Sequence, residues 1–284
     1  MARRNNSDRI SPPMGQKIPG VTPPVMGNDM GFTVPTEFVE LPTQGRLYPE
    51  GHPLHGKGEV EIRFMTAKDE DILSSQTLLR KGIMLDRFIH SVLIDKTIDP
   101  QDLYTGDRNA ILVAARITGY GSEYITNVNC PVCNSSSEYE FDIGDYKLNL
   151  ADDYQQHGLL LTPNGTYTFE TPRSKVKLEI RLMDGRVEKY LKDITISKRK
   201  NNLLETPLTD LLKMILVTVN GSSDRHHIEQ FVENMPAFDS RHLRKIYSKI
   251  NPGIDLTQDF DCPKCGSRTQ LEVPLNADFF WPKH

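Results

Sequence analysis

The chain has 284 residues, and its 34 Lys and Arg stand against 38 Asp and Glu, which gives a net charge of −4. This near balance argues against a strongly basic nucleic-acid binder, because a large phosphate-binding surface normally leaves a basic excess. No apolar run approaches the roughly 18 to 20 residues that cross a bilayer, and no apolar segment follows the basic start as it would in a secretion signal. We therefore expect no membrane role and a protein that stays in a reducing cytoplasm.

Residues 1–36 carry six prolines, scattered glycines and asparagines, and almost no apolar periodicity. Such a segment cannot bury enough surface to offset its chain entropy, so we expect an extended Pro-rich N-terminal arm that is mobile when the protein is alone. The composition fits a dispensable tail and a partner-binding arm equally well.

Residues 37–150 show periodicities typical of short strands and helices. The predicted elements are, in chain order, a strand at Glu59–Phe64, a helix capped by Thr66 with Asp69, a helix over Leu78–Ile94, a helix capped by Asp107 and ending near Thr118, and strands at Tyr124–Val128 and Glu138–Ile143. A Cys-Pro-x-Cys segment separates the last two strands.

Residues 151–284 repeat this order. The recurring features are a Glu-Ile-Arg strand at Glu61–Met65 and Glu179–Met183, an aspartate 23 residues before a cysteine pair at Asp107 and Asp239, and a strand after each pair, the second at Thr269–Leu275. Ordered recurrence of this kind favours duplication over a chance coincidence of short patterns. The predicted fold class is α+β, with two related strand-helix-strand units at residues 37–150 and 151–284.

All four cysteines of the chain fall in two matching pairs, Cys130 with Cys133 and Cys262 with Cys265. Each Cys-Pro-x-Cys knuckle directs two thiolates to one side, and two knuckles complete a closed tetrahedral zinc site. We therefore expect one structural Zn²⁺ per chain in a split four-cysteine zinc ribbon. If the repeat is real, each unit donates one knuckle and the metal joins the two units.

Other uses of the cysteines fit less well. Disulfides are disfavoured in a reducing cytoplasm, and a thioredoxin-like redox pair belongs at the start of a helix, whereas these knuckles lie between predicted strands. Four unrelated buried thiols would not fall into two matching pairs. Iron in place of zinc is the alternative that the spacing leaves open.

Motifs that resemble catalytic ones fail in context. The segment Gly51–Lys57 matches the start of a phosphate-binding loop, but Gly58 stands where a hydroxyl should bind magnesium, and a strand follows instead of a helix. The basic run Lys198–Lys200 is typical of a solvated helix end. With neither a nucleophile elbow nor a dinucleotide-binding loop, we expect neither an enzyme nor a small-molecule substrate.

Four features together resemble the baseplate hub proteins of T-even-like contractile-tailed phages. They are Leu41–Pro49, the Glu-Ile-Arg-Phe-Met strand, the two knuckles, and the terminal aromatic cluster Asp278–Pro282. The resemblance spans residues 37–284 and implies a virion component, assembled in the host cytoplasm and packed among other tail baseplate proteins. It implies no catalytic residues.

Two other functional classes remain to be tested. A zinc-ribbon protein acting on nucleic acid would need a basic or aromatic face near the knuckles, yet Asp259 and Asp261 flank the second one. A metalloenzyme would need an open coordination position, which two complete knuckles do not leave.

Overall fold

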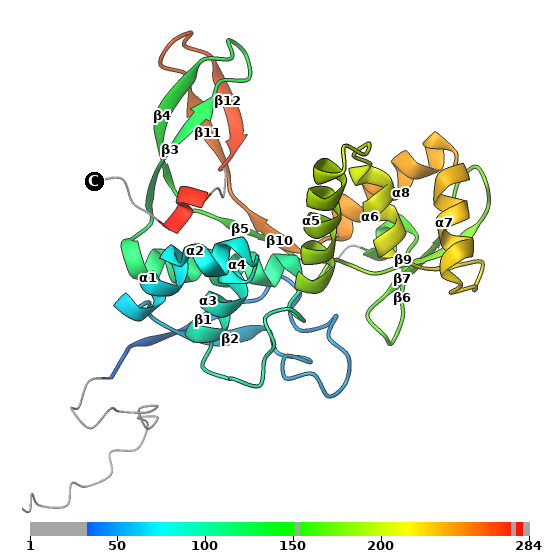
Figure 1. Ribbon diagram of the computed structural model, residues 1–284, viewed down its shortest axis with the longest axis horizontal. Coiled ribbons are helices and arrows are strands. Elements are labelled where there is room, and N and C mark those ends of the chain that lie inside the picture. The colour runs from blue at the N-terminus through cyan, green and yellow to red at the C-terminus, as the bar shows by residue number, and fades with distance from the viewer. Residues whose placement is uncertain (1–32, 151–153, 274–276, 281–284) are drawn as a thin grey trace, which may run out of the picture. The chain divides into compact units, whose positions relative to one another are not determined.

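The computed structural model describes residues 33–150, 154–273 and 277–280 (Figure 1). The chain divides into two units, residues 1–35 and residues 36–284, and every helix and strand given below belongs to the second unit. Residues 1–32 lie outside the described part of the chain. The extended, mobile arm therefore stays a prediction.

A two-stranded antiparallel sheet opens the second unit, with β1 (Thr36–Glu40) paired to β2 (Glu59–Arg63). The pairing register places Val39 opposite Val60, and both side chains lie on the buried face of the sheet. The predicted strand at Glu59–Phe64 is confirmed and ends one residue early.

Helix α1 (Ala67–Ser74) begins as predicted, with Thr66 as N-cap and Asp69 completing the capping box. The buried Asp69 carboxylate also accepts hydrogen bonds from the Arg63 guanidinium at 2.6 and 2.9 Å and from the Ser91 hydroxyl at 2.7 Å. Burial opposes ionisation, but the bonds from Arg63, Ser91 and Thr66 prevail and lower the pKa of Asp69 to about 2. One carboxylate thus ties the strand before α1 to the helix that carries Ser91.

The Asp69 contacts predict an acid-sensitive part of the stability. Because the folded pKa of about 2 lies below the ordinary value of 3.8, the contribution of about 1–2 kcal/mol is full above about pH 4 and is lost as the pH falls towards 2. Asp69→Asn should remove it. Urea titrations across this range should show the stability difference between wild type and variant shrinking in acid; a constant difference would contradict the assignment. Asp71→Asn, on the exposed face of the same helix, is the control.

The helix predicted over Leu78–Ile94 is wrong as one element. The structure has two shorter helices, α2 (Gln76–Arg80) and α3 (Met84–Val92). Between them Gly82 takes a φ of +66°, a left-handed conformation that ends a helix and costs glycine little. The apolar spacing belongs mainly to α3, which buries Phe88, Ile89 and Val92.

The next helix, α4 (Thr105–Tyr120), begins two residues before its predicted cap. Tyr104 is the N-cap residue, and Asp107 is the third residue of the helix. The carboxylate of Asp107 bonds outside the helix, to the backbone N–H and hydroxyl of Thr43. The chain leaves α4 at Gly121, whose φ of +81° explains the predicted stop.

The remaining strands form three two-stranded antiparallel sheets and one of four strands in the order β6-β7-β8-β9. The strand bounds are β3 Glu123–Asn129 paired with β4 Ser136–Asp142, β5 Lys147–Asn149 paired with β10 Gly253–Asp255, β11 Thr257–Asp261 paired with β12 Arg268–Glu272, and β6 Leu160–Leu161, β7 Tyr167–Glu170, β8 Lys177–Ile180 and β9 Leu216–Val219. The strands around each knuckle are confirmed. The one predicted at Glu179–Met183 is shifted towards the N-terminus and ends at Ile180.

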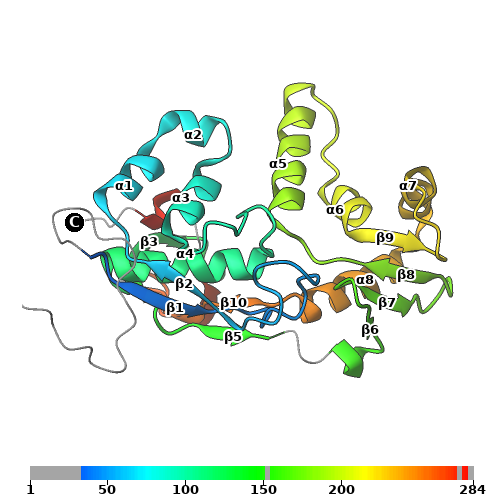
Figure 2. The same ribbon diagram turned by 90° about the horizontal axis from the view of Figure 1, so that it is seen from below.

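Four further helices and two short 3-10 turns occur among the described residues, and two of these helices contact the edge strand β9 (Figure 2). Their bounds are α5 Gly185–Lys200, α6 Pro207–Ile215, α7 Arg225–Asn234, α8 Ala237–Ile250, η1 Tyr154–His157 and η2 Ala277–Phe280. The order strand pair, helices, hairpin with knuckle occurs twice along the chain. Whether the two halves superpose as a duplication stays a prediction.

Two apolar clusters form the core. The first gathers residues from β1 to β4 together with Leu256, Phe260 and Val273 from the far end of the chain, and the second is built around the four-stranded sheet. Two aromatic residues of η2 belong to the first cluster: Phe279 packs on Tyr124 and Phe280 on Phe88, with ring centroids 5.3 and 5.0 Å apart. The unit boundary at residue 150 stays a prediction.

Candidate metal centre

The two cysteine pairs sit at the turns of two hairpins that lie side by side, β3–β4 and β11–β12 (Figure 1). Both turns have the same backbone bonding. The N–H of Cys130 donates to the carbonyl of Ser135, and the N–H of Cys262 donates to that of Ser267. In each turn the residue after the second cysteine takes a left-handed φ, +57° at Asn134 and +68° at Gly266. Equivalent local structure therefore presents each pair of thiols.

The four sulfur atoms of Cys130, Cys133, Cys262 and Cys265 all lie within 4.8 Å of one another. Two of the sulfur–sulfur distances between the hairpins, from Cys130 to Cys265 and from Cys133 to Cys262, are 3.8 Å. Four sulfurs held at about 2.3 Å from one ion would lie about 3.8 Å apart, since that is the edge of the tetrahedron. The same distance is far longer than a disulfide bond of about 2.05 Å. The four cysteines can therefore bind a single metal ion.

Two hydroxyl groups flank the sulfurs. The Oγ of Ser135 lies 3.0 Å from the sulfur of Cys133, and that of Ser267 lies 3.1 Å from the sulfur of Cys265. Each also approaches a cysteine of the other hairpin, Ser267 at 3.5 Å from Cys130 and Ser135 at 3.8 Å from Cys262. Donation from these hydroxyls would orient the thiolates, as outer-sphere partners of metal ligands commonly do.

The turns also favour the ionised thiol. The backbone N–H of Cys133, followed by the hydroxyl of Ser267, lowers the pKa of Cys130 to about 6. The backbone N–H of Cys265 lowers the pKa of Cys262 as well. Cys130 and Cys262 are buried, and Cys133 and Cys265 face solvent. Thiolates are the form that binds soft metals, so the first cysteine of each turn is prepared for a metal. The pKa of Cys265 is instead raised, because hydrogen bonds from Ser267, which lower it, are outweighed by those with the Cys133 and Cys262 side chains and by burial.

Contacts below the cysteines hold the hairpins together without a metal. The Tyr139 ring packs edge-on against Phe260 with centroids 4.9 Å apart. The Gln258 side-chain amide donates to the carbonyl of Asp142 at 2.6 Å and accepts from its N–H at 3.3 Å. The base of the hairpin pair is thus fixed by packing, whereas its tip carries the four sulfurs.

Sequence reasoning predicted that the four cysteines come together, which the structure shows, but it missed Ser135 and Ser267. A signal was present, because each serine stands two residues after the second cysteine of its pair. The segment Gly51–Lys57 is confirmed as a turn, since it runs directly into β2 and no helix follows it.

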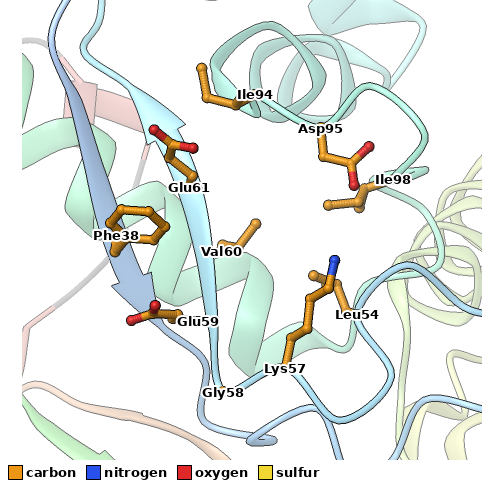
Figure 3. Close-up of a pocket in the computed structure, with 10 residues that line it drawn as sticks. All are labelled: Phe38, Leu54, Lys57, Gly58, Glu59, Val60, Glu61, Ile94, Asp95 and Ile98. Atoms are coloured by element: carbon orange, nitrogen blue, oxygen red, sulfur yellow. The ribbon is translucent and has the colours of Figure 1, made fainter. Parts of the chain in front are cut away.

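A pocket lies away from the cysteines, beside β2. About 440 Å³ in volume, it is lined by Phe38, Leu54, Lys57, Gly58, Glu59, Val60, Glu61, Ile94, Asp95 and Ile98 (Figure 3). Aliphatic groups and an exposed phenyl ring make up most of this lining.

A protein-family model described as T4 bacteriophage base plate protein matches residues 36–281. Comparisons with curated proteins and with solved structures gave no significant match. The matched range contains both hairpins and all four cysteines. Among the residues that the structure describes, no helix is long and apolar enough to cross a membrane. Because the match covers most of its length, the chain belongs to the T4 bacteriophage base plate protein family, which indicates a structural role in a phage tail baseplate.

Proposed function

We propose that the chain is a virion component of the hub region of a contractile tail baseplate, assembled in the host cytoplasm. It acts through contacts with other baseplate proteins, and one structural Zn²⁺ held by Cys130, Cys133, Cys262 and Cys265 stabilises it. The observation that carries the proposal is the family match across both hairpins. The tetrahedral spacing of the sulfurs supports the metal.

Zinc suits this set of ligands best. Four thiolates select soft or borderline ions, and sulfurs only 3.8 Å apart leave room for one ion rather than for a four-iron cluster. All four coordination positions are filled by protein, which leaves none for a water or substrate. The proposed role of the metal is therefore structural, and the proposed function involves no catalysis.

Inactivating the gene in its phage tests the proposed role. We expect infected cells to accumulate incomplete baseplates or free tail parts, visible by electron microscopy, and a plasmid copy of the gene to restore complete tails. Mass spectrometry of purified baseplates should find the chain, because the proposal makes it a virion component. Normal tails in the absence of the gene would overturn the proposal.

A zinc ribbon that binds nucleic acid is the alternative, and the charge of the hairpins opposes it. Exposed carboxylates at Glu123, Asp259, Asp261 and Glu272 lie on the same strands, and the one arginine on these strands, Arg268, is paired to Asp261 at 3.0 Å. Phosphate would be repelled from such a surface. Salt-sensitive retention of the purified chain on DNA would favour the alternative.

The N-terminal arm gives a separate prediction. Removing residues 1–35 cuts the chain immediately before the second unit, so the truncated protein should fold and bind metal like the full chain. We expect it to enter baseplates poorly, because a Pro-rich segment without an apolar face can lie along a partner at low ordering cost. Quantitative incorporation into tails is the measurement, with a Gly/Ser segment of equal length as the control. Wild-type incorporation of both variants would show a passive tail.

A further inference from the structure

Helix α5 and the loop after it carry apolar side chains that nothing in the described chain covers. Only two residues of this 16-residue helix are buried, Gly185 and Val187, and both lie in its first turn. Figure 2 shows α5 extending away from β8 and β9 and ending in the loop that returns to α6. In that loop Leu203 is 60% and Leu204 is 82% exposed. Two adjacent leucines this exposed at the end of a projecting hairpin are typical of a contact site.

The loop is held in place by polar contacts. Lys198 bonds to the Asp210 carboxylate at 2.6 and 2.8 Å, and Arg199 pairs with Glu205 at 2.8 Å. The N–H of Leu203 donates to the carbonyl of Lys198 at 2.8 Å. The exposed leucines are therefore presented on an ordered turn, which lowers the entropy lost when they bind. Lys200 adds a further positive charge beside them. We call Leu203, Leu204 and Lys200 the leucine tip.

The pocket beside β2 has the complementary properties. Its floor is formed by the buried side chains of Leu54, Val60 and Ile98, and one wall by Phe38, which is 62% exposed. Figure 3 shows Val60 between Phe38 and Ile98, with carboxylates around them. Those carboxylates belong to Glu59, Glu61 and Asp95, and only Lys57 among the lining residues opposes them. We call this pocket the acidic socket.

We propose that the leucine tip of one copy inserts into the acidic socket of a second copy. Apolar side chains would then meet an apolar floor, while Lys200 would meet an acidic rim, so both packing and charge favour the pairing. A second copy is the favoured occupant because both complementary surfaces belong to the same chain, and no other component is needed. The contact is heterologous, since different surfaces of the two copies meet. Such a contact generates a ring when the rotation between copies closes and a filament when it does not. The contact itself is independent of the proposed function, and only the expectation of a closed ring rests on the proposed baseplate role.

Sedimentation velocity of the full chain over a concentration series tests the proposal. We expect wild type to self-associate, and Leu203→Asp/Leu204→Asp to raise the dissociation constant by about tenfold or more, because it places carboxylates at an acidic socket. Phe38→Lys should also raise the dissociation constant, because the new positive charge repels Lys200. The variant should still fold, because position 38 lies opposite Glu61 across the strands and the two charges attract. Leu160→Asp, at an equally exposed leucine of β6 (70%), should leave the association unchanged.

Mixing the two association-defective variants is the decisive experiment. The tip of the Phe38→Lys chain and the socket of the Leu203→Asp/Leu204→Asp chain are both intact, so the mixture should form a one-to-one dimer that neither variant forms alone. A wild-type chain that stays monomeric up to its solubility limit would overturn the proposal, as would association that survives both variants or a mixture that fails to pair.

A photo-crosslinking residue at position 204 should attach to socket peptides. Attachment only to another baseplate protein, in assembled tails, would assign the tip to that partner instead. The two proposals can fail separately. If loss of the gene gives incomplete tails but the purified chain stays monomeric, the proposed function holds and the contact between copies is wrong.

Discussion

Replacing Cys262 by serine should abolish metal binding and lower the melting temperature by roughly 10 to 20 °C. Structural zinc contributes on the order of 10 kcal/mol in small metal domains. We expect about half of this to be lost here, because the Tyr139–Phe260 contact still holds the base of the hairpins. For a chain of this length about 5 kcal/mol corresponds to that shift in melting temperature. Elemental analysis and thermal unfolding of the protein purified without added metal are the measurements.

Val132→Ser is the matched control for the cysteine variant. Val132 lies between Cys130 and Cys133, is exposed, and offers no ligand, so its replacement should leave both metal content and melting temperature near wild type. Chelation of wild-type protein should reproduce the effect of Cys262→Ser. The zinc proposal would be overturned if wild-type protein contained no metal, or if the cysteine variant melted at the same temperature as the control.

The effect of losing the metal should be largest at the tips of the two hairpins. An isolated two-stranded hairpin is marginally stable in water, and the tips of β3–β4 and β11–β12 meet through the four sulfurs. Hydrogen exchange should therefore accelerate around residues 128–137 and 260–268. Helix α4, which is deeply buried in the first core cluster, should lose only the protection that corresponds to the fall in global stability, which is less than the hairpin tips lose. Uniform acceleration throughout the chain would show that the metal supports the whole unit.

The convergence of the cysteines could be predicted because coordination chemistry is local in sequence. Two Cys-x-x-Cys spacings demand a common centre, whatever chain lies between Cys133 and Cys262. The strands beside the knuckles were predictable because β-branched and aromatic residues gather in β3. Its burial pattern was not, since Thr126 is buried and Ile125 is exposed. The metal itself is set by affinity, which spacing alone does not fix.

Sequence periodicity failed where tertiary contacts decide. It merged α2 and α3 because their apolar residues continue in phase across Gly82, although the backbone turns there. It treated Asp107 as a cap because aspartate commonly precedes helices, whereas the turn-rich segment between β1 and β2, distant in sequence, supplies the partners of this carboxylate. The acidic socket and the leucine tip could not be predicted, since periodicity shows which residues are apolar but not which ones other segments cover.

Asp107 and Asp239 share a structural role that their equal spacing from the cysteines does not by itself reveal. Each is the third residue of its helix, fully buried, and each accepts backbone N–H groups from a turn between two strands. The turn residues are Thr43 in the first case and Arg173 with Ser174 in the second. The two aspartates, each 23 residues before a cysteine pair, therefore make equivalent hydrogen-bonded connections between a helix and a turn. Superposition of the two halves remains the test of duplication.

Replacing Asp107 by alanine should destabilise the protein by about 3 to 5 kcal/mol. The hydroxyls of Tyr48 and Thr43 both donate to one carboxylate oxygen at 2.7 Å, and the N–H of Thr43 donates to the other at 3.0 Å. All of these groups are buried, so removing the acceptor leaves three donors without water to replace it. Asp107→Asn keeps one acceptor oxygen and should cost less, and Tyr48→Phe removes a single donor and should cost about 1 kcal/mol.

The pH dependence distinguishes a buried charge from a buried hydrogen-bond acceptor. Burial raises the pKa of Asp107, and the bonds from Thr43 and Tyr48 only partly offset it. Because the folded pKa lies above the unfolded one, the stability linked to this proton is present in acid and is lost as the pH rises through the folded value. Wild type should therefore gain most over Asp107→Asn at low pH, measured by urea unfolding from pH 3 to 8. For Asp239, desolvation is outweighed by bonds from Arg173 and Ser174, which lower its pKa, so the Asp239→Asn comparison should run in the opposite direction. Parallel pH profiles for the two variants would contradict this account of the helix-to-turn connections.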